Sequence, residues 1–130
     1  MILLDTHIWI RWLLPTEPLP KNLTDLIETA DGLAVSSISC WEVILLEKFN
    51  RIELPLPVDE WLKEASEGSD VAVLPIDEKI ASLAGRLPYH HKDPADRFII
   101  ATSIVNDAEL ISLDSCFPLY VELTDLLITT

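Results

Sequence analysis

The sequence predicts an α/β fold in which a parallel sheet is covered by helices on both faces. Two observations lead to this prediction. Short apolar runs recur along the whole chain and have the length of buried strands. Between them lie segments long enough for helices, and helical crossovers make successive strands parallel. Strands buried on both faces are expected to be apolar throughout, as these runs are.

The expected elements follow one another in order. Strands are expected at 2–5, 33–36, 71–74 and 110–113, with a short fifth near 119–122. Helices are expected at 6–14, stopped by Pro15; at 22–30, capped by Asn22 or Thr24; at 39–50, opened by Ser39; at 58–67; at 77–84, with Gly85 after the end; and at 94–105. The segment 52–57 is expected to be extended, because each proline disfavours helix in the residue before it. Residues 87–92 are expected to form a loop.

Size and composition predict one domain over residues 1–130. The chain is 49% hydrophobic, which is enough for a buried core. No apolar run approaches the about 20 residues that span a bilayer, and no basic segment precedes the first apolar run, as it would in a signal peptide. We therefore expect no membrane association and a cytoplasmic location, where Cys40 and Cys116 would be reduced.

The charge balance restricts the possible partners. With 22 acidic residues against 9 Lys and Arg, the net charge is −13. This argues against binding nucleic acid through a broad basic face. A nucleic-acid enzyme remains possible only if metal ions and a few placed cations neutralise the cleaved region. The same charge favours a basic protein partner.

Four acidic residues stand where an apolar element ends or a helix begins: Asp5, Glu42, Asp96 and Asp114. Parallel α/β sheets bind ligands at the carboxyl ends of their strands, beside the starts of the following helices. All four acids fall at that edge of the predicted sheet. Carboxylates gathered there need compensation, and a hard divalent cation with oxygen ligands provides it.

A second interpretation assigns these acids to helix starts and turns. It takes Asp5 as a helix cap, Ser39 and Glu42 as a capping box, Asp93 as the cap of a helix whose first turn holds Asp96, and Asp114 as a turn residue. The two interpretations are compatible, because a capping carboxylate keeps lone pairs for a metal. Arg97, which follows Asp96, is expected to pair with a nearby acid.

Four segments resemble one known family: Leu3 to His7, Ser39 to Val43, His90 to Thr102 and Leu110 to Asp114. Together they are similar to the PIN domain, and more narrowly to the VapC-type toxins of prokaryotic toxin–antitoxin pairs. The resemblance covers nearly the whole chain, in order and with the usual separations. Its most specific part is the helix start Asp93-Pro94-Ala95-Asp96-Arg97.

The resemblance implies a Mg²⁺- or Mn²⁺-dependent endoribonuclease with a five-stranded parallel sheet of order 3-2-1-4-5. In that order the first and fourth strands are neighbours, so Asp5 and Asp114 would lie side by side. The implied roles are metal binding by Asp5, Asp96 and Asp114; metal binding or water orientation by Glu42; a place beside the ligands for Asp93; and contacts to metal-bound water from Ser112 and Thr6. The family often has Thr where this chain has Ser112, and the hydroxyl is kept.

The resemblance also implies partners. These are an RNA substrate, a small antitoxin that inserts a basic segment toward Asp5 and Asp96, and a second copy of the chain. Trp9 and Trp12 share a helix face and are expected to contribute to that homodimer. Two alternatives stay open: a degenerate, non-catalytic PIN-like binding domain, and another metal-dependent α/β phosphohydrolase. A haloacid-dehalogenase-type site would need a second Asp where this chain has His7.

Overall fold

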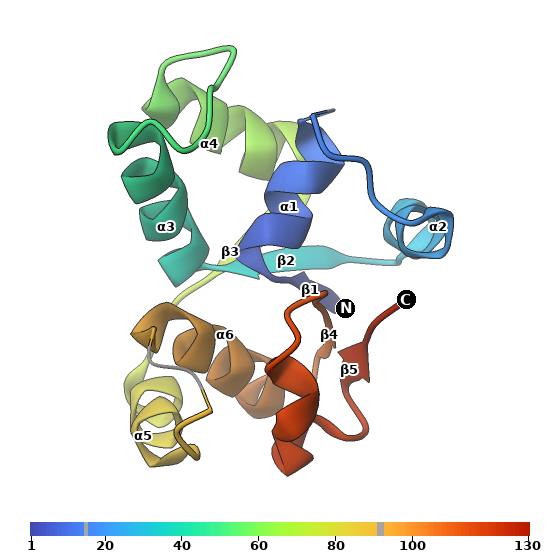
Figure 1. Cartoon of the computed structure of the whole chain (residues 1–130), viewed down its shortest axis with the longest axis vertical. Helices are drawn as coiled ribbons and strands as arrows, with labels where there is room; N and C mark the ends of the chain where they lie inside the picture. The colour runs from blue at the N-terminus through green and yellow to red at the C-terminus, as the bar shows by residue number, and fades with distance from the viewer. Residues whose placement is uncertain (15, 91–92) are drawn as a thin grey trace.

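In the part of the chain that the computed structural model describes, residues 1–14, 16–90 and 93–130, a sheet of five strands forms the middle layer (Figure 1). The strands are β1 (Ile2–Leu4), β2 (Leu33–Ser36), β3 (Val71–Leu74), β4 (Glu109–Ile111) and β5 (Leu127–Ile128). Their order is β3-β2-β1-β4-β5, and every neighbouring pair is parallel. The predicted sheet order is confirmed. The expected helix stop at Pro15 and the end of the expected loop 87–92 lie outside the described residues.

Helices cover both faces of this sheet. The first face carries α1 (Thr6–Leu13), α2 (Lys21–Thr29), α3 (Ser37–Lys48) and α4 (Val58–Ser66), and the second carries α5 (Glu78–Arg86) and α6 (Pro94–Val105) (Figure 1). Two helices connect each strand from β1 to β3 with the next strand, and the 3₁₀ segment η2 (Phe117–Leu119) and η3 (Val121–Leu123) lies between β4 and β5. All strands therefore end at the same edge, where α1, α3 and α6 meet them.

The strands are apolar because they are buried on both sides. In β1, Ile2 and Leu4 pack into the core under the first group of helices, whereas Leu3 points into the core under α5 and α6. Leu3 is paired with Ala34 on one side and with Leu110 on the other, so β1 lies at the centre of the sheet. Asp5 therefore follows a strand whose side chains pack on both faces of the sheet and whose backbone pairs with a neighbouring strand on each side.

The expected fifth strand at 119–122 is wrong. The chain forms two short 3₁₀ helices there, η2 (Phe117–Leu119) and η3 (Val121–Leu123), and the last strand is β5 instead. The buried side chains are Phe117, Tyr120 and Leu123, while Leu119 and Val121 are exposed. Burial at every third residue matches the period of a 3₁₀ helix and not the alternation of a strand.

Several predicted helix boundaries also differ. Helix α3 begins at Ser37 with Ser36 as its cap, and not at Ser39. Helix α2 follows Pro20 and has no side-chain cap, so neither Asn22 nor Thr24 caps it. Helix α5, expected at 77–84, has Asp77 as its cap and continues through Gly85 to Arg86. A third 3₁₀ helix, η1 (Glu67–Ser69), extends α4. Of the helices in the described ranges, none has the length and apolar character required to cross a bilayer.

Candidate active site

Asp5 leaves β1 at the sheet edge and begins α1. Its Oδ1 accepts a hydrogen bond from the backbone N–H of Ile8 at 2.8 Å, which makes it the helix cap. Its Oδ2 accepts a hydrogen bond from the Ser112 hydroxyl at 2.5 Å. Both groups are buried. Burial raises the pKa of Asp5, and the hydrogen bonds from Ser112 and Ile8 offset part of that rise.

Ser112 joins two of the predicted site acids. Besides donating to Asp5, its Oγ accepts a hydrogen bond from the backbone N–H of Asp114 at 3.1 Å. Asp114 Oδ1 in turn accepts from the N–H of Cys116 at 2.7 Å, as a turn residue would. Because β1 and β4 are paired, the segments after them lie side by side, as the predicted strand order requires.

Thr6 connects α1 to α3. Its hydroxyl lies 2.5 Å from Oε1 of Glu42 and 2.8 Å from Oγ of Ser39. A hydroxyl has one proton, and the carboxylate can only accept. Thr6 therefore donates to Glu42, and the bond between the two hydroxyls has Ser39 as its donor. Burial raises the pKa of Glu42, the bond from Thr6 lowers it, and the charges of Asp93 and Asp5 raise it further.

The capping box expected from Ser39 and Glu42 is wrong. Ser36 caps α3 through a hydrogen bond from the N–H of Ile38, which leaves Ser39 inside the first turn. Ser39 is fully buried against Thr6, and Glu42 turns toward Thr6 instead of back to the helix start. A buried serine three residues before a glutamate produces the same sequence pattern as a capping box.

Helix α6 supplies two acids at its N-terminus. Asp93 caps the helix by accepting from the N–H of Ala95 at 3.0 Å, with Pro94 at the first position, as predicted. Asp96 stands one turn further and is partly buried. Burial, and to a smaller extent the negative charges of Glu42, Asp114, Asp93 and Asp5, together raise the pKa of Asp96 to about 7.

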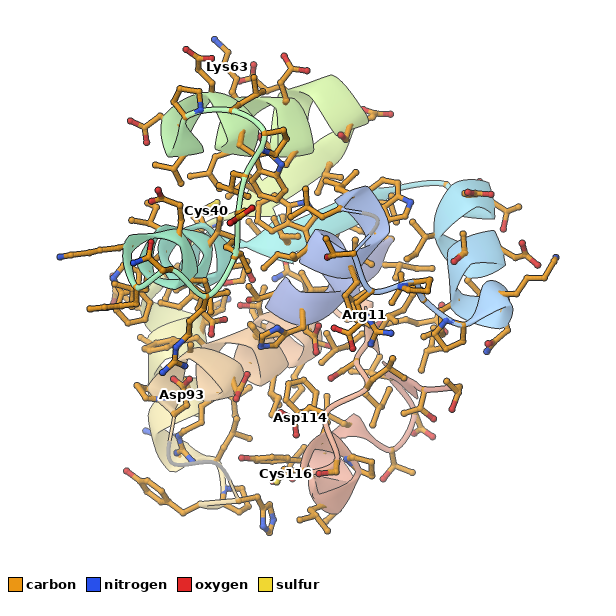
Figure 2. The ribbon with its side chains drawn as sticks, turned by 45° about the horizontal axis from the view of Figure 1, so that its top comes forward. Arg11, Cys40, Lys63, Asp93, Asp114 and Cys116 are labelled. Carbon is orange, nitrogen blue, oxygen red and sulfur yellow. The ribbon has the colours of Figure 1, made fainter. Side chains whose placement is uncertain are left out.

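The structure thus brings the predicted acids to one edge of the sheet. Besides burial, the charges of Glu42, Asp93, Asp5 and Asp114 raise the pKa of Asp96. These four acids come from four separate segments of the chain. Figure 2 labels Asp93 and Asp114, which stand at the start of α6 and beyond β4. The Thr6 hydroxyl donates a hydrogen bond to Glu42, and the Ser112 hydroxyl donates one to Asp5.

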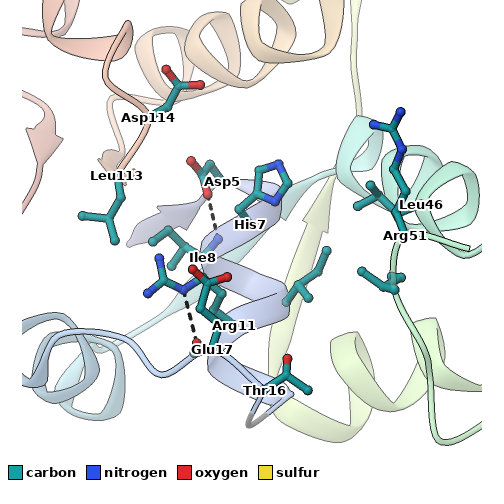
Figure 3. A pocket seen from close by; sticks show the side chains of 12 residues that line it. Asp5, His7, Ile8, Arg11, Thr16, Glu17, Leu46, Arg51, Leu113 and Asp114 are labelled. Carbon is teal, nitrogen blue, oxygen red and sulfur yellow. Dashed lines mark hydrogen bonds between the residues drawn. The ribbon is translucent and has the colours of Figure 1, made fainter.

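Two cavities that share lining residues open at this edge. The larger, of about 600 Å³, is lined by Asp5, Asp114, His7, Arg11 and Arg51 among others (Figure 3). The smaller, of about 260 Å³, is lined by Trp41, Glu42, Leu45, Phe49 and Asp93. Leu46 and Arg51 line both. Asp5 and Asp114 therefore border the larger cavity, and Glu42 and Asp93 border the smaller one.

Two arginines near the site have structural partners. Arg11 donates to the carbonyls of Glu17 and Pro18 at 3.2 and 2.7 Å, which holds the segment after α1 in place. Arg97 was expected to pair with an acid, and this is wrong. It is buried, and its guanidinium donates to the carbonyls of Ala84, Leu87 and Pro88. Those carbonyls close the end of α5, so Arg97 ties α5 to the start of α6.

The tryptophans do not form the expected paired surface. Trp9 is fully buried and donates through Nε1 to the carbonyl of Ala65 at 3.0 Å. Trp12 is partly buried against the same core. Trp41 and Phe49 are the exposed aromatic residues of α3 and its end, at 48% and 63%. The sequence indicates these exposed aromatic residues, because apolar residues occur around the whole circumference of α3.

The donor set suits a hard cation, although it is not assembled as a ligand cage. Within residues 1–14, 16–90 and 93–130, no three Asp, Glu, His or Cys side chains are already gathered at metal-binding geometry. Burial and, after it, the nearby carboxylates nevertheless raise the pKa of Asp96, and a divalent cation would relieve the repulsion among the carboxylates. Magnesium retains several waters and uses few direct carboxylates. The oxygen chemistry therefore fits Mg²⁺ or Mn²⁺ bound partly through water.

Comparison with known proteins agrees with this fold. Over 114 residues the chain is 37% identical to Ribonuclease VapC22 of Mycobacterium tuberculosis, covering 87% of this chain and 86% of the relative. Among solved structures, VapBC2 from Rickettsia felis bound to a promoter DNA fragment aligns with a TM-score of 0.70 at 18% identity, covering 99% and 98% of the two chains. VapBC-1 from nontypeable Haemophilus influenzae aligns with a TM-score of 0.66 at 22% identity, covering 100% and 97%. The sequence matches the PIN domain over residues 2–122, and the chain belongs to that family.

Proposed function

We propose that this protein is a Mg²⁺- or Mn²⁺-dependent endoribonuclease and the toxin of a toxin–antitoxin pair. The observation that carries the proposal is the convergence of Asp5, Glu42, Asp96 and Asp114 at one sheet edge, where burial first and the neighbouring negative charges second raise the pKa of Asp96 to about 7. The ribonuclease named among the relatives supports the choice of RNA as substrate. A cytoplasmic location belongs to the same proposal.

The proposed roles follow from what holds each side chain. Asp5, Asp96 and Asp114 are the proposed metal ligands, directly or through water. Ser112 and the N–H of Ile8 fix both oxygens of Asp5, so the carboxylate presents its remaining lone pairs in a set direction. A bound Mg²⁺ would lower the pKa of a water and take up charge on the phosphate oxygens.

Glu42 is placed differently from the other acids. It reaches the site from α3, and the Thr6 hydroxyl holds its Oε1. Ser39 in turn holds Thr6, so two buried hydroxyls restrict the rotamer of Glu42. We assign Glu42 either metal binding or orientation of the attacking water. Asp93, Thr6 and Ser112 are proposed to position these groups and metal-bound waters.

The test is cleavage of structured RNA by the purified protein. Cleavage should require Mn²⁺ or Mg²⁺ and stop with a chelator, and Asp5→Asn and Asp96→Asn should each lower the rate by at least about 100-fold with the fold retained. Asp31→Asn is the matched control, since it removes an exposed carboxylate between α2 and β2. Cleavage that resists chelator, or full activity in both site variants, refutes the proposed metal-dependent acidic site, and no cleavage at all leaves the non-catalytic PIN-like domain.

The proposed inhibitor is a small antitoxin with a basic segment. A toxin–antitoxin complex from Klebsiella pneumoniae is among the similar structures, with a TM-score of 0.65 at 19% identity. A cation from such a segment would compensate the same carboxylates as a metal. Replacing the basic residues of a cognate antitoxin that approach Asp5 and Asp96 should weaken inhibition. Undiminished inhibition would contradict this electrostatic mechanism.

A further inference from the structure

Helix α3 has apolar side chains on the side away from the core. Its inner side carries Val43, which is fully buried. On the outer side, Trp41 is 48% exposed, and Phe49, just past the helix end, is 63% exposed. Large aromatic side chains that are exposed to solvent beside the proposed active site suggest a surface that binds a ligand.

These residues border the smaller of the two cavities, of about 260 Å³. Trp41, Leu45 and Phe49 recur at four-residue spacing, so they follow one side of the helix. With Arg51 they form what we call the α3 pocket. Its volume is below the roughly 300–1,000 Å³ of cavities that hold drug-sized ligands. It suits one flat ring system.

The α3 pocket borders the acidic site. Two acids of that site, Glu42 and Asp93, are among the residues that line the pocket. Leu46 and Arg51 line both this pocket and the larger cavity that contains Asp5 and Asp114. A polymer whose phosphate lies at the acids would therefore reach the α3 pocket with a neighbouring unit.

The charges of the pocket fit a nucleotide. Arg51 is exposed and borders both cavities, as Figure 3 shows for the larger one. Lys48 places its ammonium 5.8 Å from the ring centroid of Phe49. Arg51 lines the pocket together with Glu42 and Asp93, and Lys48 adds a second cation beside Phe49 in a chain of net charge −13. Aromatic faces stack on bases, and cations attract the phosphates between them.

We propose that the α3 pocket binds one unpaired nucleobase of the RNA, next to the cleaved phosphodiester, with Trp41 and Phe49 as stacking surfaces and Arg51 as a phosphate contact. This inference rests on the proposed ribonuclease function and adds a binding subsite to it. Stacking tolerates any base, because every base has a π face. The pocket therefore selects for single-stranded geometry beside the cut, and not for a particular sequence.

The test is a double-mutant cycle on the cleavage reaction with Mn²⁺. The probe is a short RNA in which each nucleotide around the cut is replaced in turn by an abasic one. The protein variants are Trp41→Ala, Trp41→Phe and Arg51→Ala, with Val121→Ser as control because Val121 is exposed at 76% in η3. Melting curves verify that each variant is folded.

One abasic position should lower kcat/KM of the wild type by about 5- to 150-fold, the usual range for loss of one stacked base. Trp41→Ala should cause a similar loss on intact RNA, and the abasic substitution should then have no further effect in that variant. Trp41→Phe should restore most of the loss. Arg51→Ala should weaken cleavage of intact and abasic RNA alike and reduce its dependence on salt.

Three results would overturn the subsite. If the abasic and Trp41→Ala effects multiply as independent losses, or if no abasic position matters, no base lies in the pocket. If Trp41→Ala leaves cleavage intact but changes the oligomeric mass, the pocket is a contact between protein chains. If the wild type does not cleave RNA at all, the ribonuclease proposal fails, and the subsite fails with it.

Discussion

Replacing Asp96 by asparagine should stabilise the protein in the absence of metal while abolishing its response to Mn²⁺. In the folded protein, burial and four neighbouring acids raise the pKa of Asp96 from 3.8 to about 7. The folded state therefore holds a proton more tightly than the unfolded state does. Asp96→Asn keeps the shape of the side chain and removes the charge that is unfavourable there.

The sign and size of the effect follow from linkage. Because the pKa of Asp96 is higher in the folded state, its ionisation causes no loss of stability below about pH 4 and a growing loss as pH rises to about 7. A shift of about three units corresponds to at most about 4 kcal/mol of unfolding free energy. Partial exposure and relaxation reduce this, so we expect about 1–3 kcal/mol at pH 8.

The assay is urea unfolding at pH 5 and pH 8, with chelator and with Mn²⁺. With chelator, Asp96→Asn should exceed the wild type at pH 8 and approach it near pH 5. With Mn²⁺, the wild type should gain stability that the variant lacks, since a ligand that binds the folded state stabilises it. Asp31→Asn corrects for the loss of one negative charge from a chain of net charge −13. A site variant no more stable than Asp31→Asn at pH 8 in chelator would refute the reasoning.

Three further predictions concern the supporting residues and assembly. Arg97→Met should cost about 3–5 kcal/mol in urea unfolding, because three carbonyls lose a charged donor; a cost below about 1 kcal/mol would contradict this tie between α5 and α6. Ser112→Ala should raise the pKa of Asp5 and move the acidic limb of the pH–rate profile to higher pH, whereas Ser112→Thr should not; an unmoved limb in Ser112→Ala would show that this hydroxyl does not control Asp5. The protein should be a homodimer by light scattering at tens of micromolar, and a monomer mass would count against it.

The sheet could be predicted because its physical signal is local. Strands buried on both faces must be apolar, and helices between them force parallel pairing, so β1 to β4 were recognisable from short runs alone. The C-terminal segment lacked such a signal. Phe117, Tyr120 and Leu123 are buried at every third residue, but over a few residues that pattern resembles an irregular strand. Whether this segment adopts the three-residue period of a 3₁₀ helix or the two-residue period of a strand depends on how it packs against α6.

The acids that meet at the sheet edge were easier to predict than the contacts that orient them. The positions of Asp5 and Asp96 follow from strand ends and helix starts, which the sequence marks. The contacts that orient them do not. Nothing local shows that Ser39 would face Thr6 across two helices, or that Arg97 would turn to three carbonyls instead of to an acid. Such pairings join segments that are distant in sequence, so they depend on how α1, α3, α5 and α6 pack.

Helix capping and the proposed catalytic site use the same carboxylates here. Asp5 gives Oδ1 to the start of α1 and Oδ2 to Ser112, and Asp93 gives Oδ1 to the start of α6. A helix N-terminus carries partial positive charge, which makes it the least costly place to hold a carboxylate near others. The dipoles of α1 and α6 thus help to stabilise several neighbouring carboxylates when no cation is bound. Replacing Asp5 by Asn would keep a capping oxygen and remove the charge, whereas Asp5→Ala would remove both. The difference in unfolding free energy between these two variants, about 1 kcal/mol for a cap, separates the structural contribution of Asp5 from its role in the site.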